Sequence, residues 1–154
     1  MRITVTAESF KLAQVFTISR GSRTQADVLT VRVQDGAHQG MGECVPYARY
    51  CESLASVTAQ INALGHISHE ELGEALPAGA ARNAVDCAFW DLEAKTSGVS
   101  VAQRVGLQDL QPQITAYTLS LDSPEAMERQ ARLNAHRPLL KIKLGTPDDM
   151  PRLE

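Results

Sequence analysis

The first part of the chain alternates apolar and polar side chains with a period of two. Residues 2–8 follow this alternation, which is typical of a half-buried strand. Residues 26–33 repeat it and are followed by Asp35-Gly36, a dipeptide that favours a hairpin turn. Residues 39–44 then supply a returning strand. The pattern predicts three antiparallel strands over most of this part of the chain.

Two segments interrupt the alternation without a clear period. Residues 16–24 hold two arginines, a glycine and several hydroxyl side chains, a composition that favours a loop between the first two strands. Residues 45–53 follow the third strand and carry two of the three tyrosines. We expect both segments to be irregular.

Helical spacing of apolar residues begins after these segments. Ser53 is a suitable N-cap for a first helix, and Ser68 begins a shorter polar helix that Pro77 ends. Residues 80–95 form the strongest helical pattern, with a stripe of small apolar residues that permits close packing. Four polar residues of this helix could form a buried network, but we expect a solvated edge or ordinary interhelix hydrogen bonds and assign them no catalysis: Arg82, Asn83, Asp86 and Asp91.

The pattern changes again after residue 113, to strand, helix and strand. Residues 114–121 are rich in β-forming side chains, Ser123-Pro124 begins a helix, and residues 139–144 form a second strand. The two strands should be parallel, with a right-handed crossover. Only about one and a half repeats follow residue 113, whereas a complete (β/α)8 barrel needs about 250 residues.

The expected fold is an α+β N-terminal domain followed by the first βαβ unit of a truncated (β/α) barrel. We expect the first domain to span residues 1–112 and the second, incomplete domain to span residues 113–154. Two parallel strands without further partners expose an edge and an apolar face. The chain should therefore associate with a complementary chain, the remaining barrel portion, or with itself.

The composition narrows the classes of function. The 154 residues are 44% hydrophobic and 21% charged, which is ordinary for a globular chain. The net charge of −3 provides no basic field for nucleic acid or an anionic membrane. No apolar run approaches the length of a membrane span, about 18 residues, and the N-terminus lacks a signal peptide pattern. We expect a cytoplasmic protein without nucleic-acid or membrane partners.

The cysteines and histidines suggest no chemistry. Cys44, Cys51 and Cys87 are odd in number and form no C-x-x-C pair, which argues against a disulfide framework and a zinc cluster. Buried or inert thiols are expected. The four histidines lack the paired spacing of metal ligands, and we assign them no role.

Residues 139–145 are the most informative short segment. On a strand, Lys141 and Lys143 point to one face, and the alternating Leu140, Ile142 and Leu144 point to the other. Two interpretations compete. The segment is either an edge strand with its lysines in water or a barrel strand whose paired ammonium groups face the active-site end.

In the barrel interpretation the two lysines can perform acid/base chemistry. Two adjacent ammonium groups repel each other, and a nearby divalent cation repels both, so at least one loses its proton more readily than a free lysine. Such an amine can remove a proton next to a carboxylate when metal ions absorb the developing charge.

Three longer segments occur in order along the chain and carry a family resemblance: residues 20–23 (RGSR), 42–53 (GECVPYARYCES) and 76–88 (LPAGAARNAVDCA). With the Lys-x-Lys segment, the chain resembles the muconate-lactonizing subgroup of the enolase superfamily. The three segments are similar to bacterial dipeptide epimerases that act on L-Ala-D/L-Glu. The resemblance covers essentially all of the chain.

The resemblance implies a capping domain over residues 1 to about 110, whose segments at 16–25 and 45–53 close over the barrel mouth and choose the substrate. Arg23 matches an arginine that pairs with the side-chain carboxylate of the glutamyl residue, which a guanidinium can bind bidentately. Thr118 aligns with a threonine near the substrate. Without the resemblance, Arg23 is equally a solvated arginine and Thr118 an ordinary strand residue.

The resemblance also implies roles for the two lysines. Lys143 matches the acid/base on one face of the α-carbon, and Lys141 the neighbour that lowers its pKa. The family's second lysine and its three acidic Mg²⁺ ligands come from later strands, so we expect no metal site in this chain and no activity from it alone. Three acidic residues lie too early to be those ligands and are expected to open the next helix: Asp148, Asp149 and Glu154.

The expected function is that of the N-terminal portion of a dipeptide epimerase of cell-wall peptide turnover. Metal-assisted removal and return of the α-proton of a small dipeptide is the expected reaction, with Mg²⁺ as cofactor. A cycloisomerase or an o-succinylbenzoate synthase of the same superfamily is the nearest alternative, and the Arg23 segment argues against both. A noncatalytic α+β module that mediates assembly is an alternative of another class.

Overall fold

The computed structural model describes residues 1–107, 109–145, 147 and 149–153. The chain divides into two compact units, one of Met1–Phe10 with Asp27–Leu110, the other of Lys11–Ala26 with Gln111–Glu154. Residues 11–26 thus group with the C-terminal part of the chain. The expected domain boundary between residues 112 and 113 remains a prediction.

The first sheet has the order β1 (Arg2–Ile18), β2 (Gly21–Asp35) and β3 (His38–Cys44). β2 and β3 pair antiparallel, from Leu29 opposite Cys44 to Asp35 opposite His38. Gly36 in the connecting turn has a φ of 54°, a conformation that glycine adopts without strain. The predicted hairpin is confirmed.

The predicted loop over residues 16–24 is wrong. β1 continues to Ile18 and β2 begins at Gly21, so only Ser19 and Arg20 form the turn. Aromatic and β-branched residues at 15–18 favour extended backbone, and Gly21 accepts a φ of 138° at the turn. Residues 21–25 are exposed, which explains their polar composition.

The segment at 45–53 is irregular, as predicted, except for the 3-10 turn η1 (Ala48–Tyr50). Ser53 caps α1 (Leu54–Asn62), and its Oγ accepts a hydrogen bond from the backbone nitrogen of Ser56 at 3.1 Å. α2 (Leu72–Ala75) begins later than predicted. The backbone nitrogen of Ser68 instead donates to the Glu71 carboxylate at 2.9 Å, a local turn that replaces the first helical turn.

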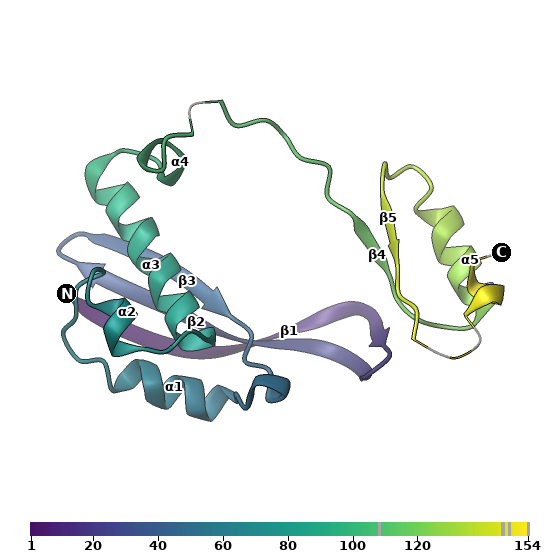
Figure 1. Ribbon diagram of the computed structural model, residues 1–154, viewed down its shortest axis with the longest axis horizontal. Helices are drawn as coiled ribbons and strands as arrows, with labels where there is room; N and C mark the ends of the chain where they lie inside the picture. The colour runs from purple at the N-terminus through teal and green to yellow at the C-terminus, as the bar shows by residue number, and fades with distance from the viewer. Residues whose placement is uncertain (108, 146, 148, 154) are drawn as a thin grey trace. The chain divides into compact units, whose positions relative to one another are not determined.

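The strongest predicted helix is confirmed as α3 (Ala80–Ser97), which ends at Gly98 in a left-handed conformation and is followed by α4 (Val101–Arg104). Figure 1 shows α3 running across the sheet. The buried core contains side chains from β2, α1, α2 and α3, including Leu29, Val57, Leu72 and Phe89. These helices therefore cover one face of the sheet.

The second unit contains β4 (Tyr117–Leu119), α5 (Pro124–Leu133), β5 (Leu140–Ile142) and the 3-10 turn η2 (Met150–Arg152). β4 and β5 pair in parallel, which confirms the predicted βαβ order, although both strands are shorter than predicted. Figure 1 shows α5 alongside the two strands. Met127 of α5 and Leu119 of β4 are buried. A closed barrel remains a prediction.

Among the described residues, no helix combines the length and the apolar character that a membrane crossing requires.

Candidate active site

Three of the four predicted site residues lie on one face of the β4–β5 sheet. Thr118 pairs in register with Lys141, so their side chains point to the same side. Lys143 lies two residues beyond Lys141 and, by the alternation of a strand, points to this side as well. On the opposite face Leu119 is 2% exposed and pairs with Ile142. We call the side of Thr118, Lys141 and Lys143 the lysine face.

The two lysines of this face influence each other. The charge of Lys141 lowers the pKa of Lys143, and desolvation, a hydrogen bond with Lys141 and the charge of Arg20 act in the same direction. Lys143 is half-buried and Lys141 exposed. The backbone nitrogen of Lys143 donates to the carbonyl oxygen of Leu119 at 3.2 Å, which fixes its position beside β4.

The tip of the β1–β2 hairpin is bonded to the end of β4 within the same unit. The backbone nitrogen of Thr17 donates to Ser120 Oγ at 2.7 Å, and the backbone nitrogen of Leu121 donates to the carbonyl oxygen of Thr17 at 3.0 Å. Ser19 lies against Gly145, where an added Cβ would overlap with the Ser19 side chain. Glycine is thus required at this close approach.

Arg23 and Thr118 line the same hollow of about 300 Å³. Tyr117 and residues of both hairpin strands complete its walls, among them Leu12, Ala13, Phe16 and Ala26. The hollow therefore combines one guanidinium-bearing residue with mostly apolar surroundings, which suits one carboxylate group of a ligand. The structure brings Arg23 beside Thr118 and places Thr118 on the lysine face.

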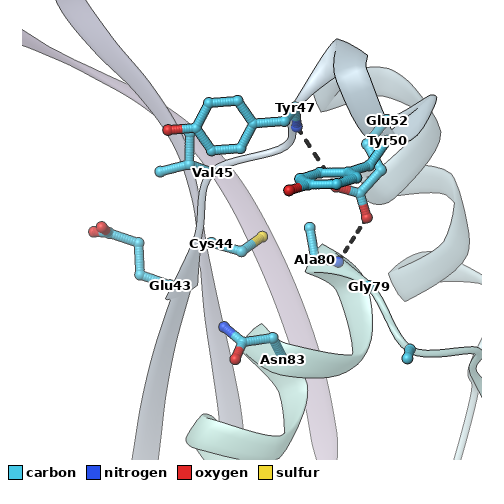
Figure 2. A pocket seen from close by; sticks show the side chains of 10 residues that line it. Glu43, Cys44, Val45, Tyr47, Tyr50, Glu52, Gly79, Ala80 and Asn83 are labelled. Atoms are coloured by element: carbon cyan, nitrogen blue, oxygen red, sulfur yellow. Dashed lines mark hydrogen bonds between the residues drawn. The ribbon is translucent and has the colours of Figure 1, made fainter. Parts of the chain in front are cut away.

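A second hollow, of about 540 Å³, lies in the other unit, between the end of β3, the segment after it and the start of α3 (Figure 2). Glu52 Oε1 accepts a hydrogen bond from the backbone nitrogen of Ala80 at 2.7 Å, where the α3 N-terminus favours negative charge. Tyr47 and Tyr50 stand at its rim, with ring centroids 6.5 Å apart. Glu52 thus has a structural task in holding this segment to α3.

One of the three cysteines, Cys44, is buried. Burial, followed by the charges of Glu52 and Glu43, raises the pKa of Cys44 to about 11, so this buried thiol stays neutral and unreactive. Cys51 and Cys87 are exposed rather than buried, and all three cysteines are free.

His69, to which the sequence pattern assigned no role, lies between two carboxylates. Its Nδ1 lies 2.6 Å from Glu93 Oε1, its Nε2 lies 2.9 Å from Asp86 Oδ1, and its ring stacks on Phe89 at 5.1 Å. Burial lowers the pKa of His69, but the hydrogen bonds to Asp86 and Glu93 outweigh it, and the net pKa is raised. Asp86 and Glu93 are seven residues apart, about two helical turns, and this spacing was the available signal.

No group of three metal-ligating side chains is arranged to hold an ion within the part of the chain that the structure describes. Asp149 Oδ2 accepts from the backbone nitrogen of Gly145 at 2.8 Å, and Asp149 Oδ1 from Arg152 Nη1 at 3.3 Å. Asp149 precedes η2, as expected of a residue that opens the next helical segment. Asp148 and Glu154 lie outside the described residues. The described residues do not fit a Mg²⁺ site.

Curated relatives align with most of this chain. The L-Ala-D/L-Glu epimerase of Escherichia coli K12 is 42% identical over 149 residues, which cover 92% of this chain and 46% of the relative. The N-acetyl-D-glutamate racemase of a Pseudoalteromonas species is 41% identical, covering 82% of this chain and 42% of the relative. The chain therefore spans about half the length of the curated relatives it matches.

Solved structures also match nearly the whole of this chain with about half of their own length. An enolase family member from Agrobacterium tumefaciens with homology to dipeptide epimerases, solved with sodium and L-Ala-L-Glu bound, is 52% identical with a TM-score of 0.93. The match covers 98% of this chain and 48% of that chain. The dipeptide epimerase of Enterococcus faecalis, solved with Mg and L-Leu-L-Tyr, is 28% identical with a TM-score of 0.85, at coverages of 98% and 48%.

A family of N-terminal domains matches most of the chain. The N-terminal domain of the mandelate racemase/muconate lactonizing enzymes matches residues 1–106, which include the first sheet and helices α1 to α4. The chain therefore belongs to the mandelate racemase/muconate lactonizing enzyme family of the enolase superfamily.

Proposed function

We propose that the chain is the N-terminal portion of a dipeptide epimerase that acts on L-Ala-D/L-Glu. The observation that carries this proposal is the hollow shared by Arg23 and Thr118, because Thr118 belongs to the lysine face. A carboxylate held by Arg23 and an α-carbon near the lysines are what epimerisation of a glutamyl residue requires. The E. coli and Agrobacterium relatives support this choice of substrate.

In this proposal Lys143 is the acid/base on one face of the α-carbon. Its neutral amine takes the α-proton onto Nζ, the C–H bond breaks, and the electron pair stays with the substrate. Lys141 keeps a larger fraction of Lys143 neutral at a given pH, because its positive charge lowers the pKa of Lys143. A proton returned from the opposite face inverts the carbon and needs a second group beyond this chain.

Arg23 is proposed to select the substrate. A guanidinium binds a carboxylate through two parallel hydrogen bonds, and mostly apolar walls strengthen such a charged pair. Thr118, beside Arg23 in the same hollow, is proposed to contact the substrate. Mg²⁺ is the proposed cofactor, as in the Enterococcus structure, with ligands supplied outside the described residues. We also propose that the protein is cytoplasmic and acts in cell-wall peptide turnover. The isolated chain is proposed to be inactive.

The test joins residues 1–154 to the part of the Agrobacterium protein that this chain does not cover. Deuterium incorporation from D₂O into L-Ala-L-Glu is then followed by mass spectrometry with Mg²⁺ present. We expect incorporation by the chimera, and a loss of about 10²–10⁴-fold in Lys143→Ala because the general base is removed. Lys11→Ala, which changes an exposed lysine of the same unit, is the matched control. A folded chimera without incorporation would favour the noncatalytic assembly module.

Racemisation of N-acetylglutamate is a second candidate, favoured by the 41% identity to the Pseudoalteromonas racemase. Both substrates contain a glutamate whose nitrogen is acylated, so Arg23 and the lysine face would serve either one. The ratio of kcat/KM for L-Ala-L-Glu to that for N-acetyl-L-glutamate separates them. A ratio above one supports the epimerase, and a ratio well below one supports the racemase.

A further inference from the structure

The contact between the hairpin tip and the end of β4 is built around one hydroxyl group. Ser120 Oγ accepts a hydrogen bond from the backbone nitrogen of Thr17 at 2.7 Å and lies 3.5 Å from the carbonyl oxygen of Thr17, to which it can donate. A serine hydroxyl can serve both groups at once because it carries one proton and two lone pairs. Ser120 is half-buried, so its bonds are partly shielded from competing water.

A second hydrogen bond carries this contact across the hairpin. Thr17 Oγ1 lies 2.8 Å from Ser22 Oγ, and Ser22 directly precedes Arg23. The connection therefore runs from Ser120 through Thr17 and Ser22 to the residue that lines the hollow. The backbone bond from Leu121 to Thr17 and the contact of Ser19 with Gly145 support the same tip from two other points.

We infer that Ser120 is a positioning residue that acts through Thr17 and Ser22 to hold Arg23 at the hollow beside Thr118. Two parallel hydrogen bonds from a guanidinium to a carboxylate require the guanidinium to be held in one orientation. An exposed hairpin tip is too mobile to hold it unless the tip is anchored. Ser120 would thereby set the preference for an acidic side chain without touching the substrate. This inference rests on the proposed function for the role of Arg23, whereas the anchor itself does not.

The kinetic test uses the chimera described above with two substrates. Ser120→Ala should raise the KM for L-Ala-L-Glu about five- to tenfold, the effect of one lost hydrogen bond, and change kcat less than about twofold. The KM for L-Ala-L-Gln, which has no side-chain carboxylate, should stay unchanged. Ser120→Thr, which keeps a hydroxyl, should restore the KM. In an Arg23→Met background Ser120→Ala should have no further effect, because coupled residues are not additive.

Two kinetic results would overturn the inference. One is an equal rise in KM for both dipeptides, which would mean general damage to the site. The other is a full effect of Ser120→Ala in the Arg23→Met background. Should Ser120→Ala not fold, Ser120→Cys keeps the volume of the side chain with a much weaker hydrogen-bonding group, and the same outcomes decide.

A structural measurement separates the anchor from the proposed function. Amide hydrogen exchange of the 154-residue chain should show faster exchange at Thr17 in Ser120→Ala, with Lys143, whose amide bonds to Leu119, as the unchanged reference. Unchanged exchange at Thr17 refutes the anchor whatever the chimera does. A chimera that leaves L-Ala-L-Glu unlabelled refutes the proposed function, while faster exchange at Thr17 still supports the anchor.

Discussion

At the level of single residues, the charge of a neighbouring lysine lowers the pKa of Lys143 more than burial does. Lys141 is exposed, yet its ammonium group is the main cause of the lowered pKa of Lys143. The alternation of residues 139–144 was sufficient to predict that both point to one face. The pairing of Lys141 with Thr118 could not be predicted, because register between strands distant in sequence depends on the folded chain.

Replacing Lys141 should therefore change the pH dependence of catalysis. Without its charge the pKa of Lys143 rises towards that of an ordinary lysine, and the neutral base is formed only at higher pH. The rising limb of kcat/KM against pH should move to higher pH in Lys141→Met and stay in place in Lys141→Arg. An unchanged limb in Lys141→Met would mean that another group sets the profile.

His69 supports a second prediction at this scale. Its folded-state pKa is raised, so its contribution to stability is present below the unfolded pKa, about 6.5, and is lost as pH rises through the folded pKa. As the pH rises from about 6.5 through the folded-state pKa of His69, the unfolding free energy should fall more steeply in the natural chain than in His69→Gln. Urea unfolding at several pH values measures this, and parallel curves would contradict it.

At the scale of elements, the packing of α3 on β3 depends on two glycines. A Cβ on Gly40 would overlap with the carbonyl oxygen of Ala88, and one on Gly42 with that of Ala84. Asp91 of α3 also accepts a hydrogen bond from the backbone nitrogen of Met41 at 2.7 Å. This bond satisfies a backbone N–H group of β3, which is an edge strand of the sheet. The small residues of the helix were visible in the sequence, but the glycines opposite them became meaningful only with the fold.

Gly42→Ala should consequently destabilise the N-terminal unit. The added methyl forces the helix away from the strand, at a cost of about 1–3 kcal/mol in unfolding free energy. Urea denaturation measures the loss. Met41→Ala, a change to a side chain 45% exposed on the same strand, should alter stability by less than about 0.5 kcal/mol. Equal stability of Gly42→Ala and the natural chain would refute this account of the packing.

At the scale of the whole molecule, local patterns predicted the order of elements better than the connections among them. Capping residues located α1, α3 and α5, because Ser53, Gly98 and Ser123 act on their own neighbours. The hairpin tip was predicted as a loop, because its polar residues suggested irregular backbone where the chain forms an exposed ribbon. The site at this tip joins residues about a hundred positions apart, and no local pattern contains that information.

Exposed apolar side chains in and just after β5 predict association of the isolated chain. Ile142 of β5 is 40% exposed and Leu144, two residues beyond the strand, is 39% exposed; β5 pairs only with β4 in the part of the chain that the structure describes. An uncovered strand edge and apolar face favour pairing with further strands. Light scattering after size exclusion should show self-association that increases with concentration. A monomer at low and high concentration alike would contradict this.

The proposed function requires that the site formed by Arg23 and the lysine face selects a substrate with a side-chain carboxylate. The most direct measurement compares α-deuterium incorporation into L-Ala-L-Glu and L-Ala-L-Gln by the chimera and its Arg23→Met variant. We predict that the chimera labels L-Ala-L-Glu faster than L-Ala-L-Gln. Arg23→Met should lower the ratio of these two rates at least about tenfold, while labelling of L-Ala-L-Gln persists. An equal preference for L-Ala-L-Glu with and without the arginine would refute the proposed role of Arg23.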